Sequence, residues 1–524
     1  MSQNNPKTRN PALNGAETLV RTLLASGVNT CFANPGTSEM HFVAALDRLP
    51  GMHCVLCLFE GVATGAADGY GRMAEKPAIT LLHGGPGLGN GLANLHNARR
   101  AQTPVLNVVG DQATHHRPLD PPLTADTEGW ARGLSAWTRV VQSVSTIGAD
   151  AAAAVQAARV AHGQIATLIA PADTCWDDGG SEGTPLPVPP AGQVAPHVIR
   201  QIAQVLRSGE PAVLILGGSP IRATMVADAQ RIAAATGAKL TAAQFNARVE
   251  RGRGRHPIPR LPYGIDQAMA VMAGAQHIVL IGTTPPVAPF AYPDKPGYLA
   301  PEAATTHVLA RPEQDVADAL ARLADELGAP DVPAPEHKRV DLPTKAEITQ
   351  ENITQMLAAL LPENAVVIDE SVSFGRNFFN GLSAAAPHDW LQITGAAIGS
   401  GLPMATGAAI AAPGRRVVAL QADGSAMYTL QALWTQARER LPITTVLLSN
   451  RKYQILLGEL TNVGANAGRI ALDMMDLGNP DIAWTSLAQG MGVEAARATT
   501  ANEFADLFVQ ANKTRGPFLI ELMT

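Results

Sequence analysis

The stretch that decides the fold is RRVVALQADGS, residues 415–425, where an apolar run ends in Asp423, Gly424 and Ser425. A short apolar run closed by turn residues is typical of a strand buried on both faces of a parallel sheet. Ligands of open α/β sheets bind at the carboxyl ends of such strands. Glycine lets the backbone approach a phosphate, and a following helix would offer free N–H groups. The stretch therefore predicts an anion or metal site.

A second run, ITTVLLSN at residues 443–450, delivers Asn450 to what should be the same edge. Neighbouring parallel strands joined by a helix would place the oxygens of Asp423 and Asn450 side by side. Mg²⁺ prefers a few oxygen ligands together with phosphate and water. One carboxylate, one amide oxygen and the backbone carbonyl of Lys452 would meet that demand.

Similar apolar runs alternate with helical patterns along the whole chain, which predicts an α/β fold. Two proline-rich stretches, GTPLPVPPAG (183–192) and GAPDVPAPEHKRVDLPT (328–344), have the composition of extended linkers. We therefore predict three doubly wound, parallel-sheet domains, at residues 1–182, 193–327 and 345–524.

The composition limits the classes of function. The 524 residues are 46% hydrophobic and 16% charged, as in a globular enzyme. The net charge of −6 and the absence of a basic run argue against nucleic acid or an anionic membrane as a partner. No apolar stretch approaches the roughly 20 residues of a membrane span, and the polar start has no signal-like segment. A cytoplasmic protein is expected.

Cys54 and Cys57 form a C-x-x-C, but on a strand they would face opposite sides, so we expect core residues and no zinc site.

A second candidate lies near the start of the chain, in CLFEGVATGAADGYGRM (57–73). Glu60 would end a buried strand and open a helix of small residues. A carboxylate with so little access to water is suited to proton chemistry. The alternative is that Glu60 only caps the helix, where a negative charge favours the helix dipole.

Taken together, these motifs resemble those of thiamine-diphosphate enzymes, whose metal motif is GDG followed about two dozen residues later by NN. This chain has ADGS and SN at that spacing, with Ala422 and Ser449 as departures and with both ligand positions intact. The Glu60 segment is similar to that of the acetolactate synthase and benzoylformate decarboxylase group. The resemblance covers the whole chain and implies pyrimidine, central and diphosphate domains. It also implies active sites shared between subunits of a homodimer or homotetramer.

The resemblance implies a mechanism as well. Glu60 would contact N1′ of the aminopyrimidine and favour the tautomer that generates the ylid, which attacks a 2-oxo acid. Loss of CO₂ would leave an enamine, and the enamine would be protonated or would attack an aldehyde or ketone acceptor. In TGAAIGSGLPMATGAA (394–409), Ile398 would support the bent cofactor and the carbonyl of Ala396 would receive its amino group. Further cofactor contacts are expected at Ser371, Ser373, Gly424, Ser425 and Tyr453.

Three histidines are candidates for the substrate side. His83 ends a predicted strand before a glycine-rich turn, and the matching histidine of benzoylformate decarboxylase faces the substrate. Histidine titrates near neutral pH and could relay a proton, although a structural role in the turn is the alternative. His115 and His116 lie in a proline-rich loop, where they could line the entrance or bind the substrate carboxylate with Arg117. A solvated loop is the slightly favoured interpretation of that pair.

Several alternatives stay open. The second histidine of benzoylformate decarboxylase has no match in GTTPPVAPFAYPDKP (282–296), Leu456 stands near the position of a glutamate in pyruvate decarboxylases, and no basic residue for a second substrate is found. Decarboxylation and acetolactate-synthase-like carboligation are therefore hard to separate. The LGG turn at 216–218 is weak evidence for FAD, which we do not expect. A Rossmann oxidoreductase would need G-x-G-x-x-G followed by a matching acidic residue at a strand end, a pattern that GPGLGNG (85–91) resembles only in part. An inactive paralogue would not need Glu60, Asp423 and Asn450.

Overall fold

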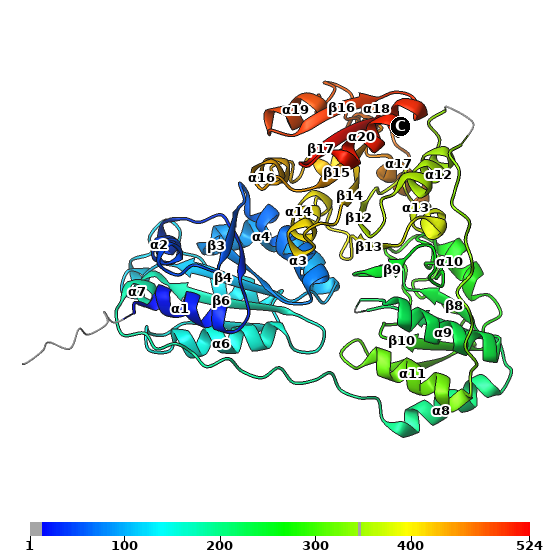
Figure 1. Cartoon of the computed structure of the whole chain (residues 1–524), viewed down its shortest axis with the longest axis horizontal. Coiled ribbons are helices and arrows are strands. Elements are labelled where there is room, and N and C mark those ends of the chain that lie inside the picture. Colours follow the sequence, from blue (N-terminus) through cyan, green and yellow to red (C-terminus); the bar gives the residue numbers. More distant parts are fainter. Residues whose placement is uncertain (1–12, 219, 344–346) are drawn as a thin grey trace, which may run out of the picture.

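The chain folds into three α/β units, each built on its own sheet, which occupy three corners of the molecule (Figure 1). The structure, a computed structural model, describes residues 13–218, 220–343 and 347–524. Within these ranges, all strand pairs are parallel except one, so the predicted class of three parallel-sheet α/β domains is confirmed. The domain boundaries stay a prediction, and residues 1–12 and 344–346 lie outside the described part.

The N-terminal sheet has the strand order β2-β1-β3-β4-β6-β5. Its strands are β1 (Thr30–Ala33), β2 (His53–Leu56), β3 (Ala78–His83), β4 (Val105–Asp111), β5 (Trp137–Val140) and β6 (Ile165–Pro171). The helices that cover it are α1 (Gly15–Ala25), α2 (Met40–Arg48), α3 (Glu60–Ala74), α4 (Gly84–Arg100), α5 (Thr127–Arg132), α6 (Ile147–Ala158) and α7 (Ala172–Trp176).

The central sheet has the order β11-β10-β7-β8. It consists of β7 (Ala212–Leu216), β8 (Lys239–Ala242), β10 (His277–Ile281) and β11 (Thr305–Ala310), with α8 (Pro196–Arg207), α9 (Ala223–Thr236), α10 (Ile265–Met272) and α11 (Val316–Leu327) around it.

The C-terminal sheet has the order β16-β17-β15-β14-β12-β13-β9. Its strands are β12 (Ala365–Glu370), β13 (His388–Gln392), β14 (Val417–Ala422), β15 (Ile443–Ser449), β16 (Glu494–Ala498), β17 (Phe518–Met523) and, from the middle of the chain, β9 (Val249–Arg251). Its helices are α12 (Gln350–Leu360), α13 (Phe378–Gly381), α14 (Gly401–Ala411), α15 (Asp423–Ala426), α16 (Ala432–Arg438), α17 (Gln454–Asn462), α18 (Arg469–Asp473), α19 (Trp484–Gly490) and α20 (Ala501–Lys513). β9 pairs antiparallel with β13 and so fastens the middle of the chain to this sheet.

The glycine-rich segment after His83 is a helix and not a turn, which corrects the sequence prediction. Gly84 has a positive φ of 59°, and α4 then runs from Gly84 to Arg100 without interruption. Its glycines are required by close packing, because a side chain at Gly85 would overlap Ala125 and one at Gly91 would press on Thr64. Tertiary contacts therefore outweigh the low helix propensity of glycine at this position.

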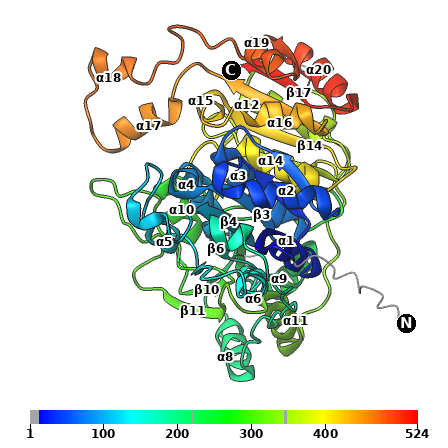
Figure 2. The same ribbon diagram turned by 90° about the vertical axis from the view of Figure 1, so that its left-hand side faces the viewer.

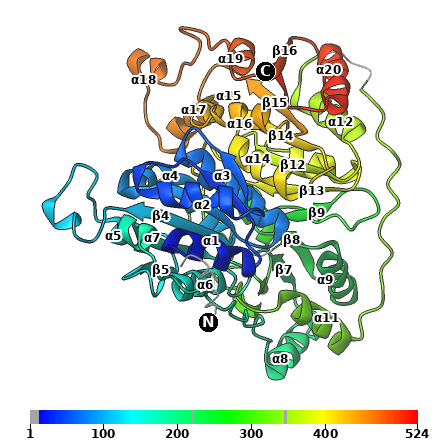
Figure 3. The ribbon, with the colours of Figure 1, turned by 60° about the vertical axis from the view of Figure 1, so that its left-hand side comes forward.

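Helices α3 and α14 hold the N-terminal and C-terminal units together, and the two lie side by side in Figure 3. Both are rich in glycine and alanine, so their backbones touch. A methyl group on Gly69 would overlap the backbone of Met404, and one on Gly407 would overlap the backbone of Ala66.

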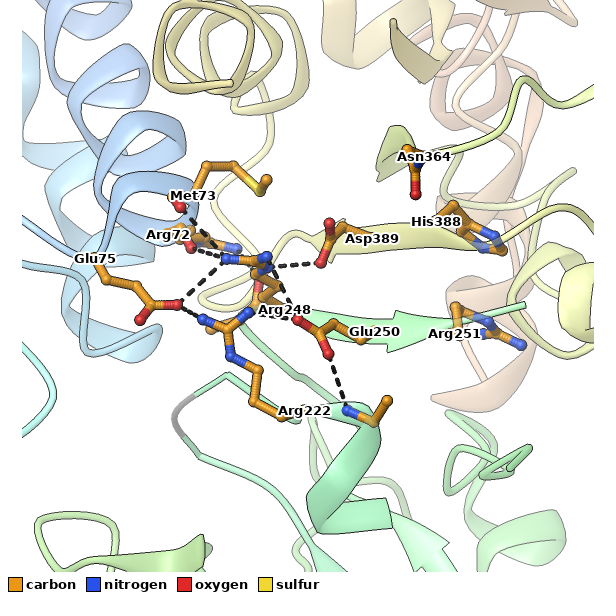
Figure 4. A network of polar contacts seen from close by, with 12 residues as sticks. Arg72, Met73, Glu75, Arg222, Arg248, Glu250, Arg251, Asn364, His388 and Asp389 are labelled. Atoms are coloured by element: carbon orange, nitrogen blue, oxygen red, sulfur yellow. Dashed lines mark hydrogen bonds and ion pairs between the residues drawn. The ribbon is translucent and has the colours of Figure 1, made fainter. Parts of the chain in front are cut away.

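An arginine network joins all three units (Figure 4). Arg248, beside β9, donates from Nε to Asp389 of β13 at 2.7 Å and from Nη1 to the carbonyl oxygen of Arg72 at 3.3 Å. Arg415 also pairs with Asp389, at 2.5 Å. Burial raises the pKa of Asp389, but the two guanidinium groups outweigh it and hold that pKa below its usual range.

Helices α17 and α18 stand out from the body of the molecule (Figure 2). Neither contains a fully buried residue, and Ile470, Leu472 and Met474 are exposed. In the described ranges, no helix is long and apolar enough to cross a membrane.

Candidate active site

Asp423 and Asn450 end two neighbouring strands, as the sequence predicts. β14 pairs with β15 so that Ala422 lies opposite Leu448, which brings the residues that follow, Asp423 and Ser449, to one edge. Asp423 is 3% exposed, and its two carboxylate oxygens accept from the N–H groups of Gly424 (2.8 Å) and Arg451 (2.7 Å). Burial raises the pKa of Asp423, although both N–H groups lower it.

The donor set fits a hard cation. No lysine, arginine or histidine of the described residues pairs with Asp423, so a buried carboxylate is left to backbone donors. Asn450 orients its side chain by accepting from the Lys452 N–H at 3.1 Å. Carboxylate, amide and carbonyl oxygens at one sheet edge are the ligands that Mg²⁺ prefers.

Tyr453, Gly424 and Ser425 surround this edge. The ring of Tyr453 packs on Gly424 so closely that a side chain on Gly424 would overlap it. Burial raises the pKa of Tyr453, and the neighbouring Tyr428 and Asp423 raise it further. The Ser425 hydroxyl donates to the carbonyl of Ala422 at 3.1 Å and accepts from Gln421 at 2.6 Å.

The loop that carries Ala396 and Ile398 is held from two sides. Ala396 has a φ of +58° and is exposed, while Ile398 is half-buried. Glu370, which the sequence prediction did not single out, anchors the end of the loop by accepting from the N–H groups of Gly399, Ser400 and Gly401 at 2.7, 3.3 and 2.6 Å. From α4, Asn97 donates to the carbonyl of Ala397 at 2.7 Å.

Ser371 and Ser373 follow β12, next to Glu370. The Ser371 hydroxyl is buried and donates to Asp369 Oδ1 at 2.6 Å, so it already has an internal partner. Ser373 is half-buried in the loop beyond. Both serines lie at the carboxyl edge that also carries Asp423, because β12 pairs with β14.

Glu60 is the first residue of α3 and is 8% exposed. Its Oε2 accepts from Asn90 Nδ2 of α4 at 3.0 Å. α4 approaches so closely that a Cβ on Gly87 would lie 3.2 Å from Glu60 Oε1. A carboxylate at a helix N-terminus can interact with the helix dipole while its oxygens face a ligand, so the capping and proton-transfer roles are compatible.

His83 has a buried carboxylate partner. Its Nδ1 lies 2.9 Å from Oε2 of Glu39, which is 2% exposed and also accepts from the Gly36 N–H at 2.7 Å. Burial raises the pKa of Glu39, while Gly36 and His83 lower it. The pair orients the imidazole and leaves Nε2 as the nitrogen available for proton transfer. Glu39 was missed because its partner is 44 residues away in the sequence.

The loop after β4 carries the other two histidines. His115 is exposed, lies 3.9 Å from Asp173 and tilts against Trp176, while His116 is also exposed. Arg117 is paired with Asp111 at 3.0 Å. This loop borders a hollow of about 710 Å³ that includes Arg117 but no other predicted site residue.

The four cysteines are free, and Cys54 and Cys57 do face opposite sides of the N-terminal sheet. Burial raises the pKa of Cys57 to about 12, which makes its thiol unreactive at neutral pH.

Comparison with known proteins agrees with this geometry. The model of the thiamine pyrophosphate enzyme N-terminal TPP-binding domain matches residues 13–132, and that of the C-terminal TPP-binding domain matches residues 375–522. A Mycobacterium tuberculosis protein named "Putative acetolactate synthase large subunit IlvX" is 50% identical over 98% of this chain and 99% of its own. The chain belongs to the thiamine pyrophosphate enzyme family. The predicted family and cofactor, thiamine diphosphate (also called thiamine pyrophosphate), are thereby confirmed.

More distant members of the thiamine pyrophosphate enzyme family share the whole length. Benzoylformate decarboxylase of Pseudomonas aeruginosa is 27% identical over 95% of this chain and 96% of its own. The structure of a Rhodococcus jostii thiamine-diphosphate-dependent 4-hydroxybenzoylformate decarboxylase superimposes with a TM-score of 0.83, at 24% identity, over 98% of this chain and 99% of that one. The last comparison shows that the fold is shared.

Proposed function

We propose that this thiamine-diphosphate enzyme acts on 2-oxo acids, breaking the bond to the carboxylate and releasing either an aldehyde or a carboligation product. The observation that carries the proposal is the buried, unneutralised Asp423 beside Asn450 at the carboxyl edge of β14 and β15. Both relatives reported above are named for reactions of 2-oxo acids.

The metal and diphosphate would be held at one edge of the C-terminal sheet. Asp423, Asn450 and the Lys452 carbonyl would hold Mg²⁺, which would neutralise charge on the diphosphate. Ser371, Ser373 and Ser425 lie on the same edge. To donate to the diphosphate, the hydroxyls of Ser371 and Ser425 would give up their bonds to Asp369 and to the Ala422 carbonyl. When bound, the cofactor supplies the reactive carbon and the electron sink.

Glu60 would hold or exchange a proton with the aminopyrimidine ring. Asn90 orients the Glu60 carboxylate, and the close approach of Gly87 limits access of water. The carbonyl of Ala396, an exposed residue with a positive φ, would accept from the amino group of the ring, and Ile398 would pack beneath the ring.

His83 would transfer the proton that distinguishes the two outcomes. Glu39 holds its Nδ1, so Nε2 can donate to or accept from the reacting carbon or oxygen. We retain His115 and His116 as candidates for the entrance, on an exposed loop at the edge of the same sheet.

The active site would be completed by a second copy of the chain. In the described residues, no hydrogen bond or ion pair links the Glu60 region with Asp423, and each side has exposed apolar groups: Trp130 near α4, and Met427 and Tyr428 beside Asp423. Exposed apolar groups around a polar centre are typical of an interface. A homodimer or homotetramer is therefore proposed.

A substrate panel tests the proposal. Pyruvate, benzoylformate and longer 2-oxo acids would be incubated with the Mg²⁺- and cofactor-loaded protein, with and without an acceptor aldehyde, and the products read by mass spectrometry. CO₂ release with aldehyde as the sole product would indicate decarboxylation, and a hydroxyketone or hydroxy-oxo acid would indicate carboligation. No turnover of any 2-oxo acid would contradict the proposal and favour an inactive paralogue.

A further inference from the structure

Four polar side chains from four separate segments, Tyr263, Tyr292, Arg376 and Glu459, meet between the central and C-terminal units. Tyr292 donates its hydroxyl to Glu459 Oε2 at 2.5 Å. The phenol of Tyr263 contacts Tyr292, and the guanidinium carbon of Arg376 lies 5.1 Å from the centre of the Tyr263 ring. This tyrosine–glutamate cluster joins the central unit to the C-terminal unit.

Two of the four members, Arg376 and Glu459, are close in sequence to site residues. Arg376 comes three residues after Ser373, in the loop beyond β12. Glu459 lies on α17, which begins at Gln454, directly after Tyr453 and the metal loop. Tyr292 belongs to the segment that follows β10. The cluster thus connects the central unit to the first helix after the predicted metal ligands.

The Tyr292–Glu459 hydrogen bond is of the strong, charge-assisted kind. Burial raises the pKa of Tyr292, and the bond to Glu459 raises it further, so the phenol stays a donor across the neutral range. α17 has no fully buried residue, so apolar packing within the chain does little to fix it. The bond to Tyr292 supplies a defined tether from the body of the protein.

We propose that Tyr292 is a positioning residue that, through Glu459, fixes α17 as a wall of the substrate site. Leu456 lies one helical turn before Glu459, on the same side of α17, and so moves with it. The inference depends on the proposed function for the identity of the substrate, a 2-oxo acid. The tether between Tyr292 and α17 does not depend on it.

Kinetics of four variants of the loaded, full-length enzyme test the role. Tyr292→Phe and Glu459→Ala should each raise KM for the 2-oxo acid about tenfold, the value of one charge-assisted hydrogen bond. The kcat and the affinity for thiamine diphosphate should stay within about twofold, because the site groups are untouched. Glu459→Gln should restore KM to within about threefold of wild type, because its amide oxygen still accepts from Tyr292. Tyr298→Phe is the matched control, since Tyr298 pairs with Thr306 at the surface of the same unit.

Two kinetic results would overturn the proposal: an unchanged KM in both Tyr292→Phe and Glu459→Ala, or a Glu459→Gln variant as impaired as Glu459→Ala. A purely structural role would lower thermal stability and the active fraction without changing KM selectively.

Amide hydrogen exchange gives a readout that needs no turnover. Residues 454–462 should exchange faster in Tyr292→Phe than in wild type or Tyr298→Phe, while the rest of the C-terminal unit is unchanged. Equal exchange in all three proteins would refute the tether. If exchange responds but no 2-oxo acid is converted by wild type, the proposed function fails and the tether stands.

Discussion

Glu370 offers the most direct test of how the candidate site is built. It is 1% exposed, and its carboxylate accepts four hydrogen bonds, three from the backbone of residues 399–401 and one from Gln421 at 3.0 Å. Burial raises the pKa of Glu370, and the four donors oppose that rise. Replacing it should therefore affect both stability and the loop that carries Ala396 and Ile398.

The size of the effect follows from the number of donors left without an acceptor. A buried donor without a partner costs about 1–3 kcal/mol. Glu370→Ala leaves four donors without an acceptor, although water entering the cavity would satisfy some of them. We therefore expect a loss of about 4 kcal/mol or more in the free energy of unfolding. Glu370→Gln keeps one oxygen and turns an amide group toward the other donors, so a loss of about 2–4 kcal/mol is expected.

Urea unfolding followed by tryptophan fluorescence is a suitable assay, because Trp390 and Trp484 are buried in the C-terminal unit. Glu503→Gln is the matched control. Glu503 also accepts from several donors, at the start of α20, but it is exposed, so this variant should lose much less of the free energy of unfolding.

The same variants should bind the cofactor more weakly. With Mg²⁺ in excess, calorimetry should show at least a tenfold loss of thiamine diphosphate affinity in Glu370→Ala, equivalent to about 1.4 kcal/mol, because the loop has lost its anchor. If Glu370→Ala unfolds at the urea concentration of wild type and binds the cofactor equally well, the loop is not held as described.

Four further tests address the remaining claims. Glu60→Gln should abolish cofactor-dependent turnover with unchanged circular dichroism, and full activity would exclude Glu60 from proton transfer. Asp423→Ala should eliminate Mg²⁺-dependent cofactor binding in calorimetry, and an unchanged affinity would place the metal elsewhere. His83→Ala should lower kcat by about 10²–10⁴-fold and Glu39→Gln by less, with a shifted pH–rate profile in the second; a normal profile would remove Glu39 from the site. Because the folded pKa of Asp389 lies below its unfolded value of about 3.9, its stabilisation is complete above that pH and is lost as the pH falls through the folded pKa. The stability difference between wild type and Asp389→Asn should therefore shrink on acidification below about pH 4, and a constant difference would contradict the ion pairing.

The strands that the sequence revealed most clearly are those with unbroken apolar runs. β14 and β15 are buried on both faces, and their apolar sequences predict strands directly. The sequence of β13 does not predict a strand, because His388, Asp389 and Gln392 are polar yet buried. Partners such as Arg248, 141 residues away from Asp389, make that burial tolerable, and no local pattern shows them.

The candidate site divides in the same way. Asp423, Asn450 and Glu60 stand at the ends of apolar runs, so their positions could be predicted from strand and helix boundaries. Glu370 and Glu39 could not, because their roles depend on backbone N–H groups and an imidazole brought close only by the fold. The start of the helix Gly84–Arg100 was predicted as a turn for a related reason: its glycines are required by close neighbours and do not indicate local flexibility.

The contact between α3 and α14 has a practical consequence for recombining this enzyme with its relatives. Gly69 and Gly407 leave no room for even one extra carbon between two backbones from opposite ends of the chain. A chimera that takes its first third from one parent and its last third from another would have to match both helices simultaneously. Crossover points should therefore be chosen so that residues 60–74 and 401–411 are inherited together, whatever is exchanged between them.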